Sequence, residues 1–200
     1  MPTARPTGHH HGDLRNALVR AALELVAERG AQGFTLAEAS RRAGVSVAAP
    51  YKHFADKEAL LAELARTGYE RQYERFSAAM AGERDPVEQL AAFAAAYVQF
   101  SADSRALFDI TFATGLDKQL YPELGRAGDR VLELLREPAA RLVRDPAGAL
   151  DLIHAVGATA HGFAAFLAEG IFGDPAGALE PTKRRARDAA RRLVTGGRSG

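Results

Sequence analysis

The chain has 200 residues, of which 47% are hydrophobic, and its formal net charge is only +1. This length suits a small domain joined to a helical body but not two large domains. Ala, Leu, Arg and Glu are abundant and β-branched residues are sparse, which favours an all-α fold. The chain contains no cysteine, which excludes disulfides, thiol catalysis and zinc sites built on cysteine.

Charge is distributed unevenly along the chain. Residues 1–60 carry 8 Lys and Arg against 6 Asp and Glu, residues 61–180 carry 11 against 18, and residues 181–200 carry 7 against 1. An acidic body is compatible with DNA binding only if it stays away from the phosphates. We find no apolar run of about 20 residues that would cross a bilayer and no secretory signal at the N-terminus, so a cytoplasmic location is expected.

The N-terminal segment is predicted to be an arm followed by a helix. Residues 1–12 contain Pro, Gly and three histidines, His9–His11, and are predicted to form a flexible arm. The histidines are either native, and then a metal-binding tract, or the remnant of a tag. The first helix is expected to begin at Asp13, a suitable N-cap, and to end at Arg29 before Gly30.

Two short helices should follow. Thr35 and Glu38 have the spacing of a capping box, which predicts the start of a helix that ends at Gly44. Ser46 is expected to cap the next short helix, which ends at Phe54. Two short helices separated by a glycine-containing turn are typical of a helix-turn-helix.

Beyond this segment the pattern predicts helices only. Asp-Pro pairs and apolar periodicity place them at residues 56–79, 86–102, 104–112, 122–144 and 146–168, with a last helix opening at Glu180-Pro181. Pro138 should kink or split its helix, and residues 170–178 are expected to form a loop.

From about Gly12 to Leu64 the sequence resembles the TetR/AcrR family of transcriptional regulators. The family signature AGVSxxxxYxHFxxKExLL is present in full from Ala43 to Leu61. One subset of the family, which this segment resembles in particular, often carries a Trp-His-Gly element, and Ala160-His161-Gly162 stands here in a matching context. The resemblance implies a helix-turn-helix DNA-binding domain at 13–60, joined by a long helix to a ligand-sensing and dimerisation domain at 61–200.

The same resemblance implies how the head contacts operator DNA. Val47, Ala48 and Ala49 would face the major groove, where apolar side chains contact thymine methyl groups instead of forming bidentate hydrogen bonds. Specificity would then depend strongly on DNA shape and on phosphate contacts. Taken alone, Tyr51 could simply pack between helices, His53 could be a surface histidine and Lys57 a solvated charge. In this order and on this scaffold, the DNA-contacting interpretation is favoured. The candidate phosphate contacts are Tyr51 and His53, and the further candidate donors are Arg15, Thr35, Arg42, Ser46, Lys52 and Lys57.

Aromatic residues cluster in the body, and two interpretations are open. Each can be ordinary core packing, or they can line a pocket for a small hydrophobic or amphipathic effector. The candidate ligand-binding residues are Phe76, Phe93, Tyr97, Phe100, Phe108, Phe112, His161 and Phe166. His154 and His161 lie seven residues apart and share a helix face, and Asp151 lies one turn before His154. These residues could form a metal site or a polar ligand site, but the spacing does not fix a complete set of ligands. A packing role is favoured for His161-Gly162, so we predict no metal and no cofactor.

The helix at 146–168 is rich in Ala and Gly, which permits close helix contacts. The resemblance implies that the last two helices of each subunit form a four-helix dimer interface, and the Arg-rich face of the last helix is expected to be mostly solvated. A twofold homodimer predicts a palindromic operator. The candidate interface residues are Ala158, Gly162, Ala165, Ala186, Ala190 and Leu193.

These observations predict a sequence-specific transcriptional regulator, specifically a ligand-responsive repressor. A ligand-independent regulator and an activator remain alternatives. A small-molecule-binding protein or an enzyme that uses the pocket is less favoured, because the chain has no nucleophile elbow, phosphate-binding loop, paired-carboxylate site or thiol. We therefore expect the chain not to be an enzyme.

Overall fold

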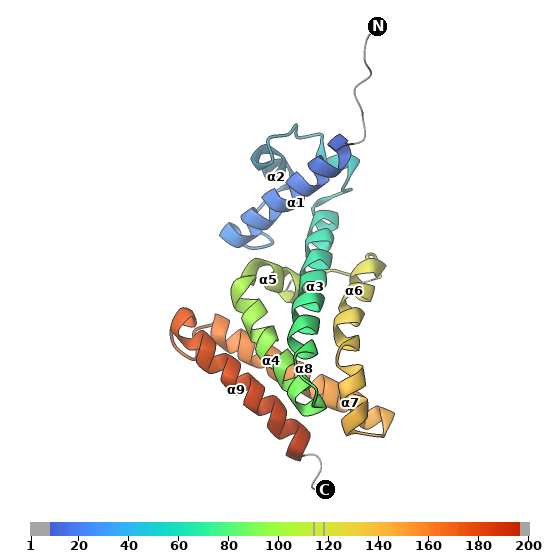
Figure 1. Ribbon diagram of the computed structural model, residues 1–200. Helices are drawn as coiled ribbons and strands as arrows, with labels where there is room; N and C mark the ends of the chain where they lie inside the picture. The colour runs from blue at the N-terminus through green and yellow to red at the C-terminus, as the bar shows by residue number, and fades with distance from the viewer. Residues whose placement is uncertain (1–8, 114, 118, 197–200) are drawn as a thin grey trace.

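The computed structural model describes residues 9–113, 115–117 and 119–196, and within them the chain is all-helical (Figure 1). The predicted all-α fold is confirmed. The elements in chain order are α1 (His9–Arg29), α2 (Leu36–Arg42), the 3-10 turn η1 (Pro50–Lys52), α3 (Lys57–Ala81), α4 (Pro86–Asp103), α5 (Arg105–Ala113), α6 (Pro122–Glu133), α7 (Arg136–Leu142), α8 (Pro146–Ala168) and α9 (Pro175–Gly196).

Helices α1 and α2, η1 and the first turns of α3 form a small head at one end of the molecule (Figure 1). Helix α1 begins at His9, so the predicted arm is wrong for residues 9–12, and Asp13 lies inside the helix. Residues 1–8 lie outside the described residues. The segment at 9–12 contains no proline, and extending an existing helix avoids the cost of a new nucleus.

The first half of the helix-turn-helix is confirmed in detail. Glu38 N donates to Thr35 Oγ1 at 3.2 Å, and Thr35 N donates to Glu38 Oε2 at 2.8 Å, which completes the capping box. Helix α2 ends in a Schellman motif: Gly44 N donates to Arg41 O, and Val45 N donates to Ser40 O. Gly44 has φ 71°, a left-handed conformation that favours glycine.

The third helix does not begin at Ser46 as predicted. Regular structure in this segment is confined to the 3-10 turn η1, which starts at Pro50 and has no side-chain cap. Pro50 has no N–H, so it cannot make the α-helical bond to the carbonyl of Ser46. Instead Ala49 N donates to Ser46 O at 2.9 Å, which closes a turn before η1. Val47, Ala48 and Ala49 therefore precede the helical turn instead of lying within it.

Helix α3 connects the head to the body (Figure 1). Asp56 caps its first turn by accepting a hydrogen bond from Ala59 N at 2.7 Å. In the body α3 packs against α4, α5 and α6. Gly68 allows the contact with α5, because a Cβ atom there would lie 2.7 Å from Thr111 Oγ1.

Helix α4 lies at the centre of the body, packed against α3, α7, α8 and α9. Ion pairs join α4 to the last helix: Arg191 Nε and Nη2 donate to the two oxygens of Glu88 at 2.7 Å each, and Arg187 Nη2 donates to Glu83 at 2.5 Å. Hydrogen bonds from Arg191 and Arg187 hold the pKa of Glu88 at about 2. The prediction of a mostly solvated arginine face is therefore wrong for Arg187 and Arg191.

Two predicted helix boundaries in the body are also wrong. The helix at 122–144 divides at Leu134–Leu135, not at Pro138, which lies in the first turn of α7. An N–H is not needed in a first turn, so proline is tolerated there. Helix α9 begins at Pro175 because Asp174 accepts a hydrogen bond from Gly177 N at 3.1 Å, which shortens the expected loop at 170–178.

Helix α8 is apolar and long enough, by composition and length alone, to cross a membrane, although the sequence suggested no such run. Only 28% of its most apolar window is buried within the subunit. It packs against α4, α7 and α9 on one side. The expectation that Gly162 lets another helix approach is not met within the subunit, because a Cβ atom there would meet nothing within 4 Å.

Candidate functional site

The segment from Ser46 to His53 presents the predicted DNA-contacting side chains at the surface of the head. Val47 is 50% exposed and Tyr51 is 62% exposed. Ser46, Ala48 and Lys52 are also exposed, whereas Ala49 and His53 are half-buried. Pro50 and Phe54 anchor the segment because both are buried. The exposed side chains are available to a nucleic-acid partner without unfolding the head.

Two of the predicted cationic contacts, Arg42 and Lys57, already have partners within the chain. Arg42 Nη1 and Nη2 donate to the two carboxylate oxygens of Glu28 at 2.5 and 2.8 Å, and this hydrogen bonding lowers the pKa of Glu28. Lys57 Nζ donates to the carbonyl of Gln32 at 3.2 Å and lies 4.9 Å from the Phe34 ring centre. Thr35 Oγ1 is engaged in the capping box. DNA would have to compete with these internal partners.

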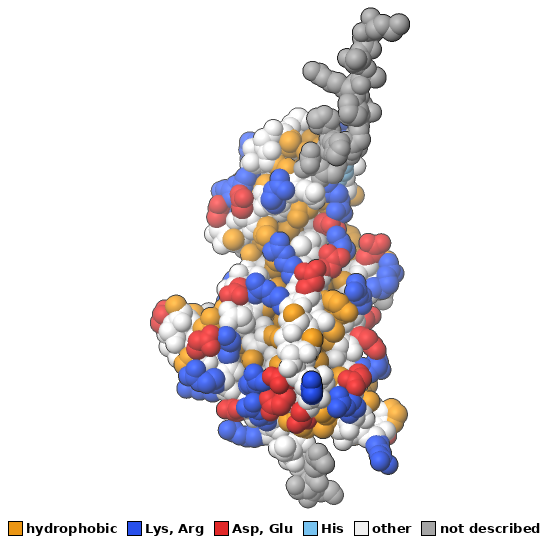
Figure 2. Space-filling view, viewed as in Figure 1, with side chains coloured by type: hydrophobic (Ala, Val, Ile, Leu, Met, Phe, Trp, Pro, Cys, Tyr) orange, Lys and Arg blue, Asp and Glu red, His pale blue; other side chains and the backbone are white. Residues whose placement is uncertain are grey.

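Charges of both signs are interspersed over the head and the body on the face shown in Figure 2. No broad single-sign patch is apparent on that face. Phosphate contacts would therefore come from individually placed donors.

Arg15 joins the head to α3 instead of standing free for DNA. Its Nη1 donates to Glu63 at 2.5 Å, and Arg66 donates to the same carboxylate at 2.8 and 3.0 Å. Burial opposes ionisation of Glu63, but the hydrogen bonds and charges of Arg66 and Arg15 outweigh it and hold the pKa at about 2. This carboxylate is a fixed negative charge at the junction between head and body.

The body contains a cavity of about 380 Å³ between α3, α4, α5, α6 and α8, and this cavity is open to solvent on one side. This volume lies within the usual range for small-molecule sites. The cavity is lined by Tyr69, Gln72, Phe93, Tyr97, Phe112, Gly128, Asp129, Val131, Leu132, Gly157, Ala158 and His161.

Four of the predicted ligand-binding residues line this cavity and four do not. The lining residues are Phe93, Tyr97, Phe112 and His161. Phe76 and Phe100 are buried in the core, where Phe76 stacks on Tyr97 with ring centres 5.5 Å apart. The remaining two are Phe108, which packs against His161, and Phe166, which is 47% exposed on α8 and lies against Phe172.

Tyr97 and His161 share a hydrogen bond of 3.0 Å between Tyr97 Oη and His161 Nδ1. Tyr97 is thus the polar hydrogen-bond partner expected for His161, whose ring also stacks on Phe108 with ring centres 5.5 Å apart. Burial raises the pKa of Tyr97, so its side chain stays a neutral phenol. The pair fixes the orientation of two polar side chains at the cavity wall.

Gln72, Asp129 and Tyr69 also line the cavity, although the sequence pattern did not indicate them. Gln72 is only 1% exposed, and its Nε2 has no hydrogen-bond partner among the described residues. A buried amide without a partner costs about 1–3 kcal/mol. One sequence signal for Gln72 was available. It is a polar residue one helical turn before Phe76, so it lies on the face of the helix that is expected to be buried.

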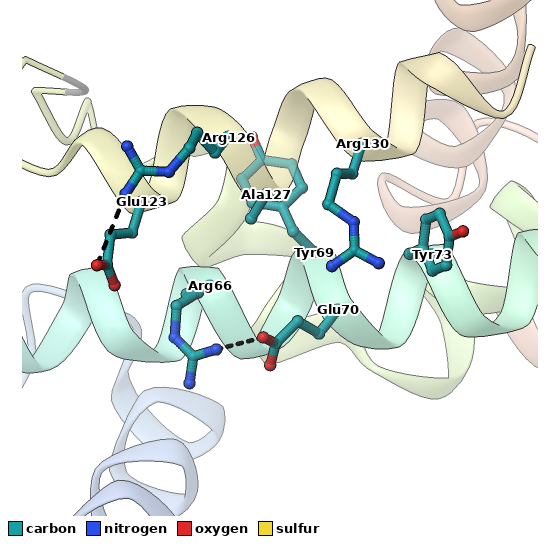
Figure 3. Close-up of a pocket in the computed structure, with 8 residues that line it drawn as sticks. All are labelled: Arg66, Tyr69, Glu70, Tyr73, Glu123, Arg126, Ala127 and Arg130. Carbon is teal, nitrogen blue, oxygen red and sulfur yellow. Dashed lines mark hydrogen bonds and ion pairs between the residues drawn. The ribbon is translucent and has the colours of Figure 1, made fainter.

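A second cleft, of about 320 Å³, lies between α3 and α6, and Tyr69 lines both sites (Figure 3). Arg130 reaches from α6 toward Tyr73, with its guanidinium carbon 4.5 Å from the ring centre. Arg66 is paired with Glu70, and Arg126 lies 3.6 Å from Glu123. The cleft is therefore rich in arginine, but Glu70 and Glu123 already pair with two of its three arginines.

The structure separates the predicted dimer residues into two groups. Ala186 and Ala190 are fully buried within the subunit, so their predicted place on an interface surface is wrong. A helix that packs its small residues against α4 cannot present the same residues outward. The remaining candidates reach the surface: Ala158 and Leu193 are exposed, and Gly162 and Ala165 are half-buried.

Among the residues whose side chains the structure describes, no group of three His, Asp or Glu side chains is placed to hold a metal ion. The side chains of His9–His11 lie outside the described set.

Two family models match the chain. Residues 18–64 match the bacterial regulatory proteins of the tetR family, and residues 90–193 match the tetracyclin repressor-like C-terminal domain. The chain belongs to the TetR family. The two matches cover the helix-turn-helix with the start of α3, and the body from α4 to α9.

Solved structures agree with this assignment. A protein with unknown function from a Rhodococcus species is 30% identical with a TM-score of 0.76, covering 94% of this chain and 98% of that one. The TetR-family regulator PfmR from Thermus thermophilus is 22% identical (TM-score 0.68; 88% and 97%), and FadR from Bacillus subtilis, in complex with stearoyl-CoA, is 16% identical (0.71; 90% and 98%). At 22% and 16% identity, the likeness to PfmR and FadR shows the fold alone. A search of curated proteins finds no match.

This TetR-family chain is therefore a DNA-binding transcriptional regulator with a helix-turn-helix head. Its predicted role as a regulator is confirmed.

Proposed function

We propose that the protein is a cytoplasmic, homodimeric repressor that releases a palindromic operator when an effector enters the cavity of the body. The observation that carries this proposal is the cavity itself, which lies in the same helical bundle as the helix that connects to the head.

The exposed segment of the head supports the DNA contacts. Val47, Ala48 and Ala49 would contact base edges, and Tyr51 and His53 would donate to phosphates. Arg42 and Lys57 would exchange their internal oxygen partners for phosphate oxygens, with Ser46, Lys52, Arg15 and Thr35 as peripheral donors. Because the base contacts are apolar, much of the specificity would come from DNA shape.

The apolar surface of α8 and its neighbours supports the dimer. Leu150 and Phe166 on α8, Ile171 after it and Leu193 on α9 are all exposed in the single subunit. Exposed apolar patches of this kind usually mark an interaction site. A second copy related by a twofold axis would cover them, and would place Gly162 and Ala165 at the point of close approach.

Helix α5 supports the coupling between effector and DNA. It contacts α1 in the head and α3 and α4 in the body, and its Phe112 lines the cavity. An effector that displaces Phe112 would shift α5 against α1 and would change the spacing of the two heads. The effector must bind the state that does not bind DNA more tightly, or it would shift nothing.

The direct test is a titration of the protein against DNA from upstream of its own gene at several salt concentrations. Tyr51→Phe is expected to weaken binding, because one phosphate donor is lost. Lys57→Ala is expected to weaken it and to lower the salt slope by about one unit. The matched controls are Tyr121→Phe and Lys183→Ala in the body, which should behave as the unmodified protein. If the head variants match their controls, the phosphate assignments are wrong.

A further inference from the structure

Gln72 is the least explained polar side chain in the cavity. It lies on α3, is 1% exposed and lines the cavity, yet its Nε2 has no hydrogen-bond partner among the described residues. Buried polar groups in proteins almost always have a partner. Nε2 itself is fully buried, so the amide must turn toward the cavity, and an acceptor that enters the cavity can then satisfy it.

The charges around the cavity restrict what that molecule can be. None of its described lining residues is Lys or Arg, and Asp129 is the one carboxylate among them. An anion in this cavity would face a carboxylate without a compensating cation, and burial of an unpaired charge is strongly unfavourable. The rest of the wall is mainly aromatic and aliphatic, which favours an apolar body for the ligand.

We propose that the cavity selects an uncharged, largely apolar molecule whose carbonyl-type oxygen accepts a hydrogen bond from Nε2 of Gln72. This inference rests on the effector role proposed above and deepens it, since it names the chemical class and the residue that determines specificity. Tyr97 and His161 already bind each other, which leaves the Gln72 amide as the unpaired buried donor in the described wall.

Three naphthalene probes of the same size separate the possible ligand chemistries. 2-Acetylnaphthalene carries the carbonyl acceptor, 2-isopropenylnaphthalene replaces the oxygen with a methylene group, and 2-naphthoate carries a negative charge. Calorimetric titration can report the binding of all three probes, including the ketone, which fluoresces only weakly. The quantity to measure is the ratio of the dissociation constants of the hydrocarbon and the ketone.

Gln72→Met keeps the length of the side chain and removes its amide. We expect it to lower the preference for the ketone over the hydrocarbon by about tenfold. Gln99→Met is the matched control, because Gln99 lies on α4, donates to Asp103 and does not line the cavity. Gly157→Leu should weaken all three probes, because a Cβ atom there meets nothing within 4 Å and the leucine would fill the cavity.

A measurement on the unmodified protein covers the case in which Gln72→Met does not fold. The side-chain amide resonance of Gln72 should shift when the ketone binds and should shift much less with the hydrocarbon. An unchanged preference in Gln72→Met, an unmoved amide resonance, or no binding of the ketone would each overturn the inference. Tighter binding of 2-naphthoate that persists in Arg130→Ala would also overturn it. Loss of that binding in Arg130→Ala would instead place the anion in the arginine-lined cleft of Figure 3 and leave the inference standing.

The upstream-DNA titration distinguishes this failure from failure of the proposed function. If specific DNA binding is retained while the ketone preference does not depend on Gln72, only the ligand inference fails. If the unmodified protein does not bind its upstream DNA specifically, the proposed function fails, and the probe preference remains a property of the cavity.

Discussion

The head and the body of the molecule use their sequence in different ways. In the head, the candidate DNA contacts come mainly from eight consecutive residues, 46–53, together with a few cations nearby. In the body, the cavity takes its lining from five helices that are spread between residues 69 and 161. A surface site on a short loop can be recognised from local sequence, whereas an interior site depends on how distant helices pack.

The two regions also differ in how charge is handled. In the head, Arg15 and Arg42 are paired with the carboxylates of Glu63 and Glu28 of the same chain. The cavity has no Lys or Arg among its described lining residues and leaves a neutral donor, Gln72, unpaired. The paired cations of the head can exchange their internal partners for DNA phosphates. The uncharged donor in the cavity favours a neutral ligand.

The largest expected effect tests whether the aromatic cluster of the body is core or site. Phe76→Ala should lower the free energy of unfolding by about 3–5 kcal/mol, because a fully buried ring leaves a void. Phe166→Ala, at an exposed position, should change it by less than about 1 kcal/mol. Thermal or denaturant unfolding measures both. Similar losses in the two variants would show that Phe166 is also covered, as it would be in a dimer.

The junction between head and body should be sensitive to acid. The pKa of Glu63 is lowered from 4.5 to about 2, so its contribution to stability is complete above about pH 4.5 and is lost as the pH falls toward 2. The loss should amount to about 2–3 kcal/mol. Glu63→Gln should flatten the dependence of unfolding free energy on pH in this window. An unchanged acid profile in Glu63→Gln would mean that Arg15 and Arg66 do not hold the carboxylate in solution.

A smaller effect is expected at the DNA surface of the head. Glu28→Gln should strengthen DNA binding, because Arg42 would lose the bidentate carboxylate that it must exchange for phosphate. Glu24→Gln is the control, since Glu24 lies 3.9 Å from Arg42 and is well exposed. Equilibrium titrations at one salt concentration compare them. Weaker binding by Glu28→Gln would indicate that the Glu28–Arg42 pair positions the helix-turn-helix instead of competing with DNA.

The smallest expected effects come from two glycines of the body. Gly128→Ala should destabilise the protein by about 1 kcal/mol, because its Cβ atom would lie 3.3 Å from Tyr69 Cζ. Gly162→Ala meets nothing within 4 Å in the subunit and should gain up to about 1 kcal/mol in helix propensity. Chemical denaturation separates the two variants. A loss at Gly162 would show that a second subunit packs there.

The sequence predicted the head more accurately than the cavity, and the reason is physical. The capping box of Thr35 and the turn at Gly44 are local, so their residues determine the structure without help from the rest of the chain. The predicted helix at Ser46 is wrong because Pro50 lacks the N–H that an α-helical bond to Ser46 would need. Local rules apply where the hydrogen-bond partners are a few residues apart.

In the body, periodicity identified apolar faces but could not distinguish core from cavity. Phe93 lines the cavity and Phe100 does not, although they share one face of α4. Gln72 and Asp129 come from α3 and α6 and meet only through tertiary packing. The error at Ala186 and Ala190 has the same origin, because a small apolar face fits either a neighbouring helix or a second subunit.

The bidentate contact between Arg42 and Glu28 has a consequence for the thermodynamics of DNA association. A cation that is neutralised by a fixed carboxylate does not need a mobile anion from the solvent, and its transfer to phosphate leaves that carboxylate to recruit a cation from solution. The entropy gained when DNA releases its condensed cations is then partly cancelled at this position. The salt dependence of operator binding should therefore be shallower than a count of the basic side chains at the interface would suggest.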